Sequence, residues 1–368
     1  MADVLALFTE LAAIPSPPGR ERLVADRVVA WLAERGLAAD EDGAGATIGS
    51  DTGNLYCRLE ATAAGEPLFL CAHLDTVPPV GPIEPVVEDG VVRNAAGTIL
   101  GADNKAAVAA MLGAVDRILA ERRPHAGIEL VLTPMEEVGL RGAGAFDCGR
   151  LHARTGFVYD QDGPIGEVIL GAPHVQSLEA RFHGRAAHSG MAPEEGRSAI
   201  AAAARAVADL RLGRLDEETT ANVGVIAGGT ATNVVPEWCE LSAEARSHDE
   251  RKVAELVQEM VDAFAFAANA ADCEVSTELR KSYRGYRFRR DDAVVRLAAA
   301  ALERCGFEPR YGLSGGGADA NVFNEQGLAC VNLANGMLDI HTPAERIAVL
   351  DLERMVDVTL ALADAALA

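Results

Sequence analysis

Three short apolar runs, each followed at once by acidic or histidine residues, constrain the fold of this chain most strongly. They read PLFLCAHLD at residues 67–75, GIELVLTPMEE at 127–137 and TGFVYD at 155–160. A continuous apolar run of five or six residues is typical of a strand buried on both faces, as in a mostly parallel sheet. Residues 101–123 separate the first two runs, and their alanine-rich composition favours a long helix. Strands that alternate with helices predict an α/β fold, with a mixed, mostly parallel sheet flanked by helices.

The pattern changes from continuous apolar runs to alternating ones between residues 177 and 286. Here strand-like and helical segments follow one another in the order β-α-β-β-α-β, which is the order of the ferredoxin-like split motif. The earlier pattern resumes afterwards. We therefore predict a main domain formed by residues 1–176 and 287–368, with an inserted α+β domain at 177–286. Hinges are expected near residues 174–177 and 285–288, where the chain crosses between the domains.

Charge and cysteine content exclude several classes of partner. The formal net charge is -22, which disfavours nucleic acid and anionic membranes as partners. No run reaches the ~18 apolar residues of a membrane-spanning helix. The first residues carry Asp3 and Glu10 and no basic leader, so a signal peptide is not expected. Seven widely spaced cysteines without a CxxC pair argue against disulfides and a thiolate zinc site, and they fit a reducing cytoplasm.

Histidine and acidic residues gather where strands end or a helix begins. In open α/β sheets, ligands lie beyond the carboxyl ends of the strands, and imidazole and carboxylate groups are donors that Zn²⁺ accepts. Each residue also has a structural interpretation, as a helix cap or as a polar turn, and taken singly these alternatives stay open. The positions are His73 with Asp75, Asp103, Glu136 with Glu137, Asp160, and His341.

Two of these positions hold residue pairs with a chemical rationale. A metal-binding imidazole usually donates its second N–H to a carboxylate, and Asp75 is placed to accept it from His73. Glu136 and Glu137 are consecutive and point in different directions, so one can bind a metal while the other faces a substrate. Two neighbouring acids also raise each other's proton affinity, which suits a general base.

Five motifs occur in an order that resembles a known family. They are HLDTVP, GADNKAAVA, MEEVGLRGA, YDQDG and IHTPAE. Together they resemble the peptidase T, glutamate carboxypeptidase and succinyl-diaminopimelate desuccinylase family of di-zinc amide hydrolases. The resemblance covers essentially the whole chain and is closest to peptidase T-like proteins, through SGGGADANVFN and IHTPAERI.

The resemblance implies two Zn²⁺ ions per subunit, and Co²⁺ or Mn²⁺ could replace zinc because mixed nitrogen and oxygen ligands accept all three. His73 and Asp160 would bind one ion. Glu137 and His341 would bind the other, and Asp103 would bridge the two. In this family the peptide bond that follows the bridging aspartate is often cis.

The resemblance also implies catalytic and substrate-binding roles. Asp75 would stand behind His73, and Glu136 would be the general base. The main domain would be the catalytic di-zinc domain, and the inserted domain would be a lid and dimerisation domain. His188 would help to stabilise the oxyanion, and in dimeric relatives this histidine comes from the partner subunit. The substrate-binding residues would be His188, Asn233, Arg246, Gly315 and Gly316; Ala318 follows this glycine loop where many relatives have serine.

The expected activity is hydrolysis of short peptides by an aminopeptidase, with tripeptides as the expected substrates. The alternatives are an N-acyl amino acid deacylase or desuccinylase and a carboxypeptidase, which the same metal site could serve. A non-catalytic binding protein is disfavoured because Glu136 and all five ligands are present. The expected partners are a short peptide and a second subunit bound through the lid domain.

Overall fold

The chain divides into two compact units in a computed structural model that describes residues 3–367. Unit 1 comprises the described residues up to 172 and from 287 onward. Unit 2 is Pro173–Tyr286, and it begins close to residue 177, where the sequence pattern changes.

The centre of unit 1 is a nine-stranded mixed sheet. Its strand β3 (Leu68–His73) lies between β6 (Ile128–Thr133) and β7 (Thr155–Gln161) and is parallel to both. All six residues of β3 and all six of β6 are buried, which explains their apolar sequences. The fold class predicted for the main domain is thus confirmed. The other strands of this sheet are β1 (Ala39–Glu41), β2 (Leu55–Leu59), β16 (Ala329–Ala334), β8 (Glu167–Ala172), β14 (Tyr286–Arg287) and β15 (Arg310–Leu313).

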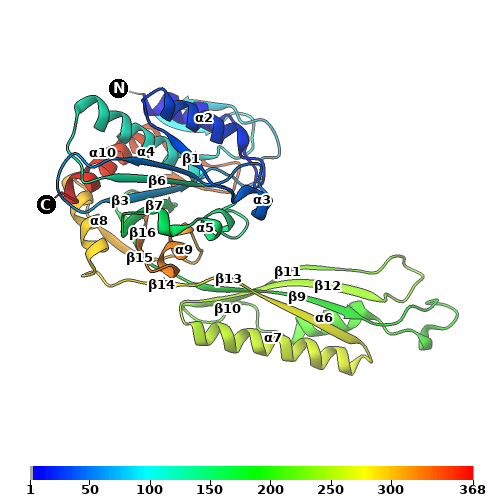
Figure 1. The fold of residues 1–368 in the computed structure, drawn as a ribbon. Helices are drawn as coiled ribbons and strands as arrows, with labels where there is room; N and C mark the ends of the chain where they lie inside the picture. The colour runs from blue at the N-terminus through cyan, green and yellow to red at the C-terminus, as the bar shows by residue number, and fades with distance from the viewer. Residues whose placement is uncertain (1–2, 368) are drawn as a thin grey trace. The chain divides into compact units, whose positions relative to one another are not determined.

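Helices cover both faces of this sheet (Figure 1). Helices α1 (Val4–Ala12), α4 (Ala102–Glu121) and α10 (Val349–Ala365) pack together on one face, and α5 (Arg141–Ala145) and α9 (Asp319–Glu325) lie on the other. Most of α4 is buried, and its many alanines allow it to pack closely against β3, β7 and α10. The remaining helices of unit 1 are α2 (Arg22–Ala33), α3 (Gly45–Ile48), α8 (Ala293–Arg304) and the short 3₁₀ helix Cys148–Arg150.

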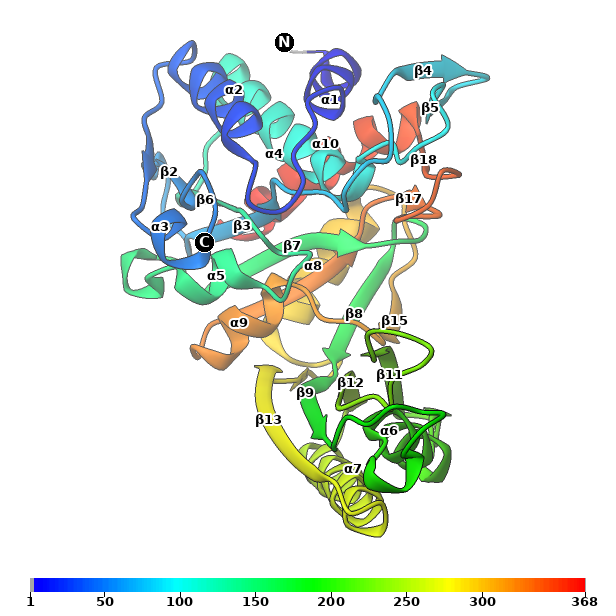
Figure 2. The same cartoon turned by 90° about the vertical axis from the view of Figure 1, so that its right-hand side faces the viewer.

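A small four-stranded antiparallel sheet, which was not predicted from the sequence, lies beside the main sheet of unit 1 (Figure 2). It pairs β4 (Pro85–Glu88) with β5 (Val91–Asn94), β5 with β18 (Arg346–Ala348), and β18 with β17 (Met337–Leu338). These strands are two to four residues long and lack an extended apolar run, so the sequence carries little signal for them. The small sheet fixes both ends of the loop that carries His341.

Unit 2 has the predicted β-α-β-β-α-β order, with one additional strand of two residues, β10, between α6 and β11. Its antiparallel sheet has the strand order β10-β11-β12-β9-β13, and α6 (Ala199–Asp209) and α7 (Glu250–Ala270) pack against it. Phe182 of β9 and Phe264 of α7 are fully buried, with ring centroids 6.0 Å apart. The strands are β9 (His174–His183), β10 (Gly213–Arg214), β11 (Thr219–Gly228), β12 (Trp238–Ser247) and β13 (Glu274–Tyr283), and a 3₁₀ turn spans Pro193–Glu195.

Within residues 3–367, no helix combines the length and the apolar character that crossing a membrane requires. The seven cysteines are all free thiols, and four of them are buried: Cys57, Cys71, Cys239 and Cys330.

Candidate metal centre

The carboxyl ends of β3, β6 and β7 bring histidine and acidic side chains together at one edge of the main sheet. His73 is the last residue of β3, and Asp160 lies near the end of β7. Glu136 and Glu137 follow β6 after a tight turn in which Met135 has a positive φ of 56°. Because the three strands are adjacent and parallel, these residues meet at the same edge of the sheet.

Asp103 lies between two imidazole rings. Its Oδ1 is 3.1 Å from Nε2 of His73, and its Oδ2 is 3.1 Å from Nε2 of His341. Asp103 does not cap α4, because Gly101 occupies the cap position and Asp103 itself has non-helical backbone angles. The Asp103–Asn104 peptide bond is cis, as the resemblance implied.

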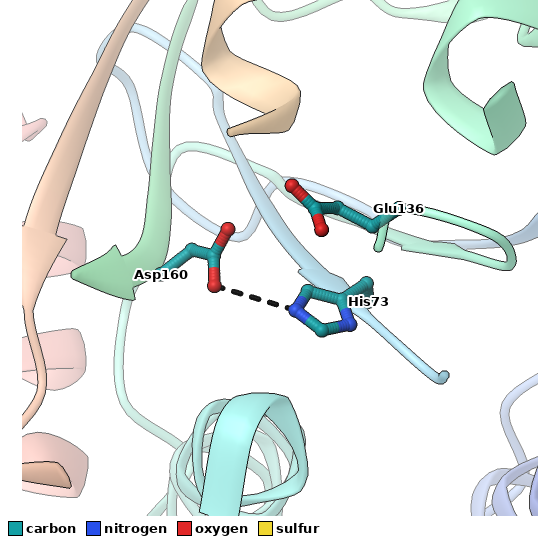
Figure 3. A group of neighbouring side chains, drawn as sticks. All are labelled: His73, Glu136 and Asp160. Carbon is teal, nitrogen blue, oxygen red and sulfur yellow. Dashed lines mark ion pairs between the residues drawn. The ribbon is translucent and has the colours of Figure 1, made fainter. Parts of the chain in front are cut away.

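The remaining donors form one group on each side of Asp103. Oδ1 of Asp160 lies 3.3 Å from Nε2 of His73, and Oε1 of Glu137 lies 3.1 Å from Nε2 of His341. Figure 3 shows His73, Asp160 and Glu136 turned toward one another from three different segments. Each side therefore offers an imidazole nitrogen, a carboxylate and one oxygen of Asp103. This donor set fits two divalent cations that share one carboxylate.

Two asparagines hold Asp160 in place, and neither was predicted from the sequence as part of the site. The side-chain amide of Asn104 donates to Oδ1 of Asp160 at 2.6 Å. Asn332 of β16 accepts from the backbone N–H of Asp160 at 2.8 Å and donates to its backbone oxygen at 3.1 Å. For Asn332, the sequence offers one indication of a special role: it is a polar residue within the apolar run ACVNLA of β16.

Asp75 contacts both His73 and the turn that carries the two glutamates. Nδ1 of His73 is 2.8 Å from the backbone oxygen of Asp75, whereas the nearest carboxylate oxygen is 3.5 Å away. The carboxylate accepts instead from the backbone N–H groups of Glu136 at 3.0 Å and Glu137 at 3.1 Å. Asp75 is fully buried, so it fixes the position of the acidic pair relative to His73.

Burial and charge perturb the proton affinities of the whole cluster. Burial raises the pKa of Glu136 well above its usual range, and the nearby charge of Asp160 adds to this effect. Burial likewise raises the pKa of Asp160, to about 7. Hydrogen bonds to Asp103 and Glu137 raise the pKa of His341 to about 10. Burial alone would lower the pKa of His73, but the surrounding carboxylates raise it well above its usual range. A buried group of acids this dense is stabilised by cations.

The expected substrate-binding residues of unit 2 fall into two separate places. His188 and Asn233 lie on neighbouring segments, because the residue after His188 donates its backbone N–H to the backbone oxygen of Asn233 at 3.0 Å. Both residues are exposed. Asn233 comes shortly before the first residue of β12, Trp238. Arg246 lies near the other end of β12, eight residues and ~26 Å along the strand from Trp238. It forms two hydrogen bonds with Glu244, of 2.9 and 3.0 Å.

The glycine loop precedes α9 in unit 1. Gly316 donates its backbone N–H to the hydroxyl of Ser314 at 3.1 Å, and open space surrounds the position of a Cβ at Gly315. Ala318 is buried, and its methyl side chain offers no polar group at the position where many relatives have serine.

Two regions of the chain match known peptidase families. Residues 174–272 match the peptidase dimerisation domain, and residues 54–164 match peptidase family M28. An uncharacterised protein of Bacillus subtilis, YqjE, is 37% identical over 99% of this chain and 98% of its own length. Peptidase T of Vibrio cholerae is 28% identical over 73% of this chain and 65% of its own length.

Solved structures agree with these matches. The aminopeptidase PepT from Bacillus cereus is 38% identical and superimposes with a TM-score of 0.88, over 99% of this chain and 98% of that one. A tripeptidase from Staphylococcus aureus is 35% identical, with a TM-score of 0.92 over 98% of this chain and 97% of that one. The chain therefore belongs to the peptidase T-like family of metallopeptidases.

Proposed function

We propose that this protein is a di-zinc aminopeptidase that removes the N-terminal residue from short peptides, with tripeptides as its main substrates. The observation that carries the metal part of the proposal is the position of Asp103, whose two carboxylate oxygens each face a different imidazole at 3.1 Å. The aminopeptidase and tripeptidase part is supported by two solved structures, an aminopeptidase and a tripeptidase, that are each more than 30% identical to this chain and align over nearly all of it.

In this proposal each ion has its own ligands and shares Asp103. His73 and Asp160 hold the first ion, and Glu137 and His341 hold the second. When bound, the two ions would supply an activated water and a polarised peptide carbonyl. Zinc is proposed over cobalt and manganese because the resemblance implies it, although the mixed donor set accepts all three.

Glu136 moves the proton in the proposed reaction. Its carboxylate is nearly buried and belongs to the same donor group as His73 and Asp160, but it is not needed as a ligand for either ion. It would accept a proton from the attacking water and deliver that proton to the nitrogen of the leaving amine. Asp75 holds the backbone N–H groups of Glu136 and Glu137, so the base and the ligand keep a fixed separation.

The proposed substrate-binding residues are Gly315 and Gly316 in unit 1 and His188, Asn233 and Arg246 in unit 2. The backbone N–H groups of Gly315 and Gly316 and the guanidinium of Arg246 would bind carbonyl and carboxylate oxygens of the peptide. His188 and Asn233 lie far from Arg246 along the sheet of unit 2, which supports their action in a second subunit's site. A homodimer through unit 2 is therefore part of the proposal, as is a cytoplasmic location, which the seven free thiols support.

A substrate panel tests the activity. Purified protein with added Zn²⁺ is offered a tripeptide, its N-acetylated and C-amidated forms, the matching di- and tetrapeptides, and an N-succinyl amino acid. We expect release of the N-terminal residue from the tripeptide and none from its N-acetylated form. Release of the C-terminal residue would favour a carboxypeptidase, and release of acetate or succinate would favour a deacylase. Light scattering during gel filtration tests the dimer, and a monomer at micromolar concentration would contradict it.

A further inference from the structure

The side chain of Glu345 is buried in unit 1 without a role in the proposed reaction. It is 2% exposed and lies four residues after His341, at the end of the loop between β17 and β18. Its carboxylate accepts three backbone hydrogen bonds from residues 100–103, where α4 begins. Oε2 accepts from Leu100 at 2.7 Å and from Gly101 at 2.8 Å, and Oε1 accepts from Asp103 at 2.9 Å.

The backbone N–H groups that bind Glu345 lie at the start of α4, where helical hydrogen bonding does not supply acceptors. Gly101 has a positive φ of 78°, and Asp103 and Asn104 have non-helical angles, so the first turn of α4 is distorted where a helix normally has free N–H groups. No side chain caps this helix end from the N-cap position itself. Glu345 therefore supplies, from more than 240 residues away in sequence, the acceptor that a local cap would provide.

The loop that carries Glu345 is held together internally. Glu345 donates its backbone N–H to the backbone oxygen of Thr342 at 3.1 Å, and the Thr342 hydroxyl donates to the backbone oxygen of Asp339 at 2.7 Å. Arg346 forms an ion pair with Asp339 across the base of the loop. His341 has a positive φ of 62° within this loop, and its side chain is 46% exposed. A rigid loop tied at Glu345 thus sets where this exposed imidazole lies.

From these contacts we infer that Glu345 is a positioning residue that ties the His341 loop to the Asp103 segment and thereby preforms the second ion's half of the proposed metal centre. The inference rests on the proposed metal site. The first ion's half depends less on this tie, because His73 and Asp160 lie on adjacent strands of the main sheet.

The test is Co²⁺ titration of metal-free wild-type protein and Glu345→Gln, followed by visible absorption and calorimetry. Glutamine has the same shape, but its amide N–H₂ must face at least one of the three backbone donors, so one charge-assisted hydrogen bond is lost. We expect one of the two ions to bind about 10- to 100-fold more weakly, with an altered absorption spectrum for that ion, and the other to change less than about 3-fold.

Glu129→Gln is the matched control. Glu129 is 1% exposed in β6 and also accepts backbone hydrogen bonds, from His152 at 3.0 Å and Ala153 at 2.8 Å. The residue of β6 that pairs with His73 is Thr133. Glu129 lies four residues before Thr133, or ~13 Å along the strand. Glu129→Gln should lower thermal stability but leave both Co²⁺ affinities unchanged. Equal loss of affinity in the two variants, or no loss in Glu345→Gln, would overturn the inference.

Hydrogen exchange of the metal-free protein gives a readout that does not depend on metal binding. In wild-type protein the amides of Leu100, Gly101 and Asp103 should exchange slowly, and in Glu345→Gln they should exchange at least about 10-fold faster. Rapid exchange at these amides in wild-type protein would sink the inference even if the variant did not fold. If wild-type protein binds two ions but hydrolyses no peptide, the proposed function fails while the role of Glu345 stands.

Discussion

The tightest glycine in the main sheet gives a quantitative test of the core that supports the metal centre. Gly156 of β7 lies beside Phe69 of β3, and the two residues pair across the parallel ladder. A Cβ at residue 156 would lie 2.2–2.4 Å from three carbons of the Phe69 ring. Non-bonded carbons normally keep ~3.5–4.0 Å apart, so Gly156→Ala requires a displacement of more than ~1 Å.

Neither partner can move freely to make this room. Phe69 is completely buried, and its ring lies 4.9 Å from the ring of Phe323, centroid to centroid. Overpacking in such a site costs ~1–3 kcal/mol, and the severity of this contact places Gly156→Ala at ~3 kcal/mol or more. Phe69→Ala alone should cost ~3–5 kcal/mol through the cavity it leaves.

The two substitutions together should cost less than their sum. In the double variant the methyl group added at position 156 occupies part of the space that Phe69 leaves, so we expect a favourable coupling of ~2–3 kcal/mol. Urea unfolding followed by tryptophan fluorescence measures this. The chain has two tryptophans, Trp31 in unit 1 and Trp238 in unit 2, so a Trp238→Phe background reports on unit 1 alone.

Gly144→Ala is the control for the backbone effect of replacing glycine. Gly144 lies in α5 with nothing within 4 Å of an added Cβ, so this change should leave stability unaltered or raise it by ~0.5–1 kcal/mol. A loss of less than ~1 kcal/mol in Gly156→Ala, or strict additivity in the double variant, would refute the packing argument.

Three further predictions concern the reaction, the metals and pH. Glu136→Gln should retain both ions but lower kcat by ~10²–10⁴-fold, measured by peptide hydrolysis and metal analysis. Chelation should lower the melting temperature reported by Trp31 but not that reported by Trp238, because only unit 1 holds the donors; the loss is ~2.7 kcal/mol if free metal was about 100 times its Kd. Hydrogen bonding to Arg22 lowers the pKa of Glu41 to about 2, against ~4.3 unfolded, so its stabilising effect is complete above pH ~4.3 and is lost as pH falls toward 2.

Each of these has a matched comparison. Glu137→Gln should lose an ion where Glu136→Gln does not, and equal metal loss in both would contradict the assignment of the base. A chelator that shifts both tryptophan transitions equally would contradict a metal site confined to unit 1. For pH, the difference in unfolding free energy between wild-type and Glu41→Gln should shrink between pH ~4.3 and ~2. Glu10 pairs with Arg27 and is more exposed than Glu41. The difference in unfolding free energy between wild-type and Glu10→Gln should therefore change less over the same pH range.

Much of the site could be predicted because its residues follow strands that the sequence marks clearly. His73 and Asp160 lie on strands with long buried runs, and Glu136 with Glu137 comes directly after another. The periodicity of residues 177–286 similarly predicted the order of elements in unit 2. In these segments a single physical requirement, burial on one or both faces, determines both the sequence pattern and the structure.

The parts that escaped prediction depend on contacts between segments that are distant in sequence. Nothing local to Glu345 shows that its partners are the amides of residues 100–103. The role of Asp103 was ambiguous for the same reason, since an acid at a helix start is usually a cap. His125 is a further example, because it lies in a loop and is nevertheless only 4% exposed.

The metal centre thus draws its ligands from two kinds of support. His73 and Asp160 lie on adjacent strands of the main sheet, whose pairing and burial fix them independently of any ion. His341 lies in a loop between two very short strands, half exposed, and its imidazole is placed by its own loop and by contacts to Asp103 and Glu137. Because a ligand on a loop can be displaced at a lower cost in free energy than one on a central strand, the ion held by His341 should be the first to leave. The hydrogen bonds of Glu345 to the Asp103 segment oppose this loss. They give a buried acid with no part in proton transfer a structural role beside a cluster already dense in carboxylates.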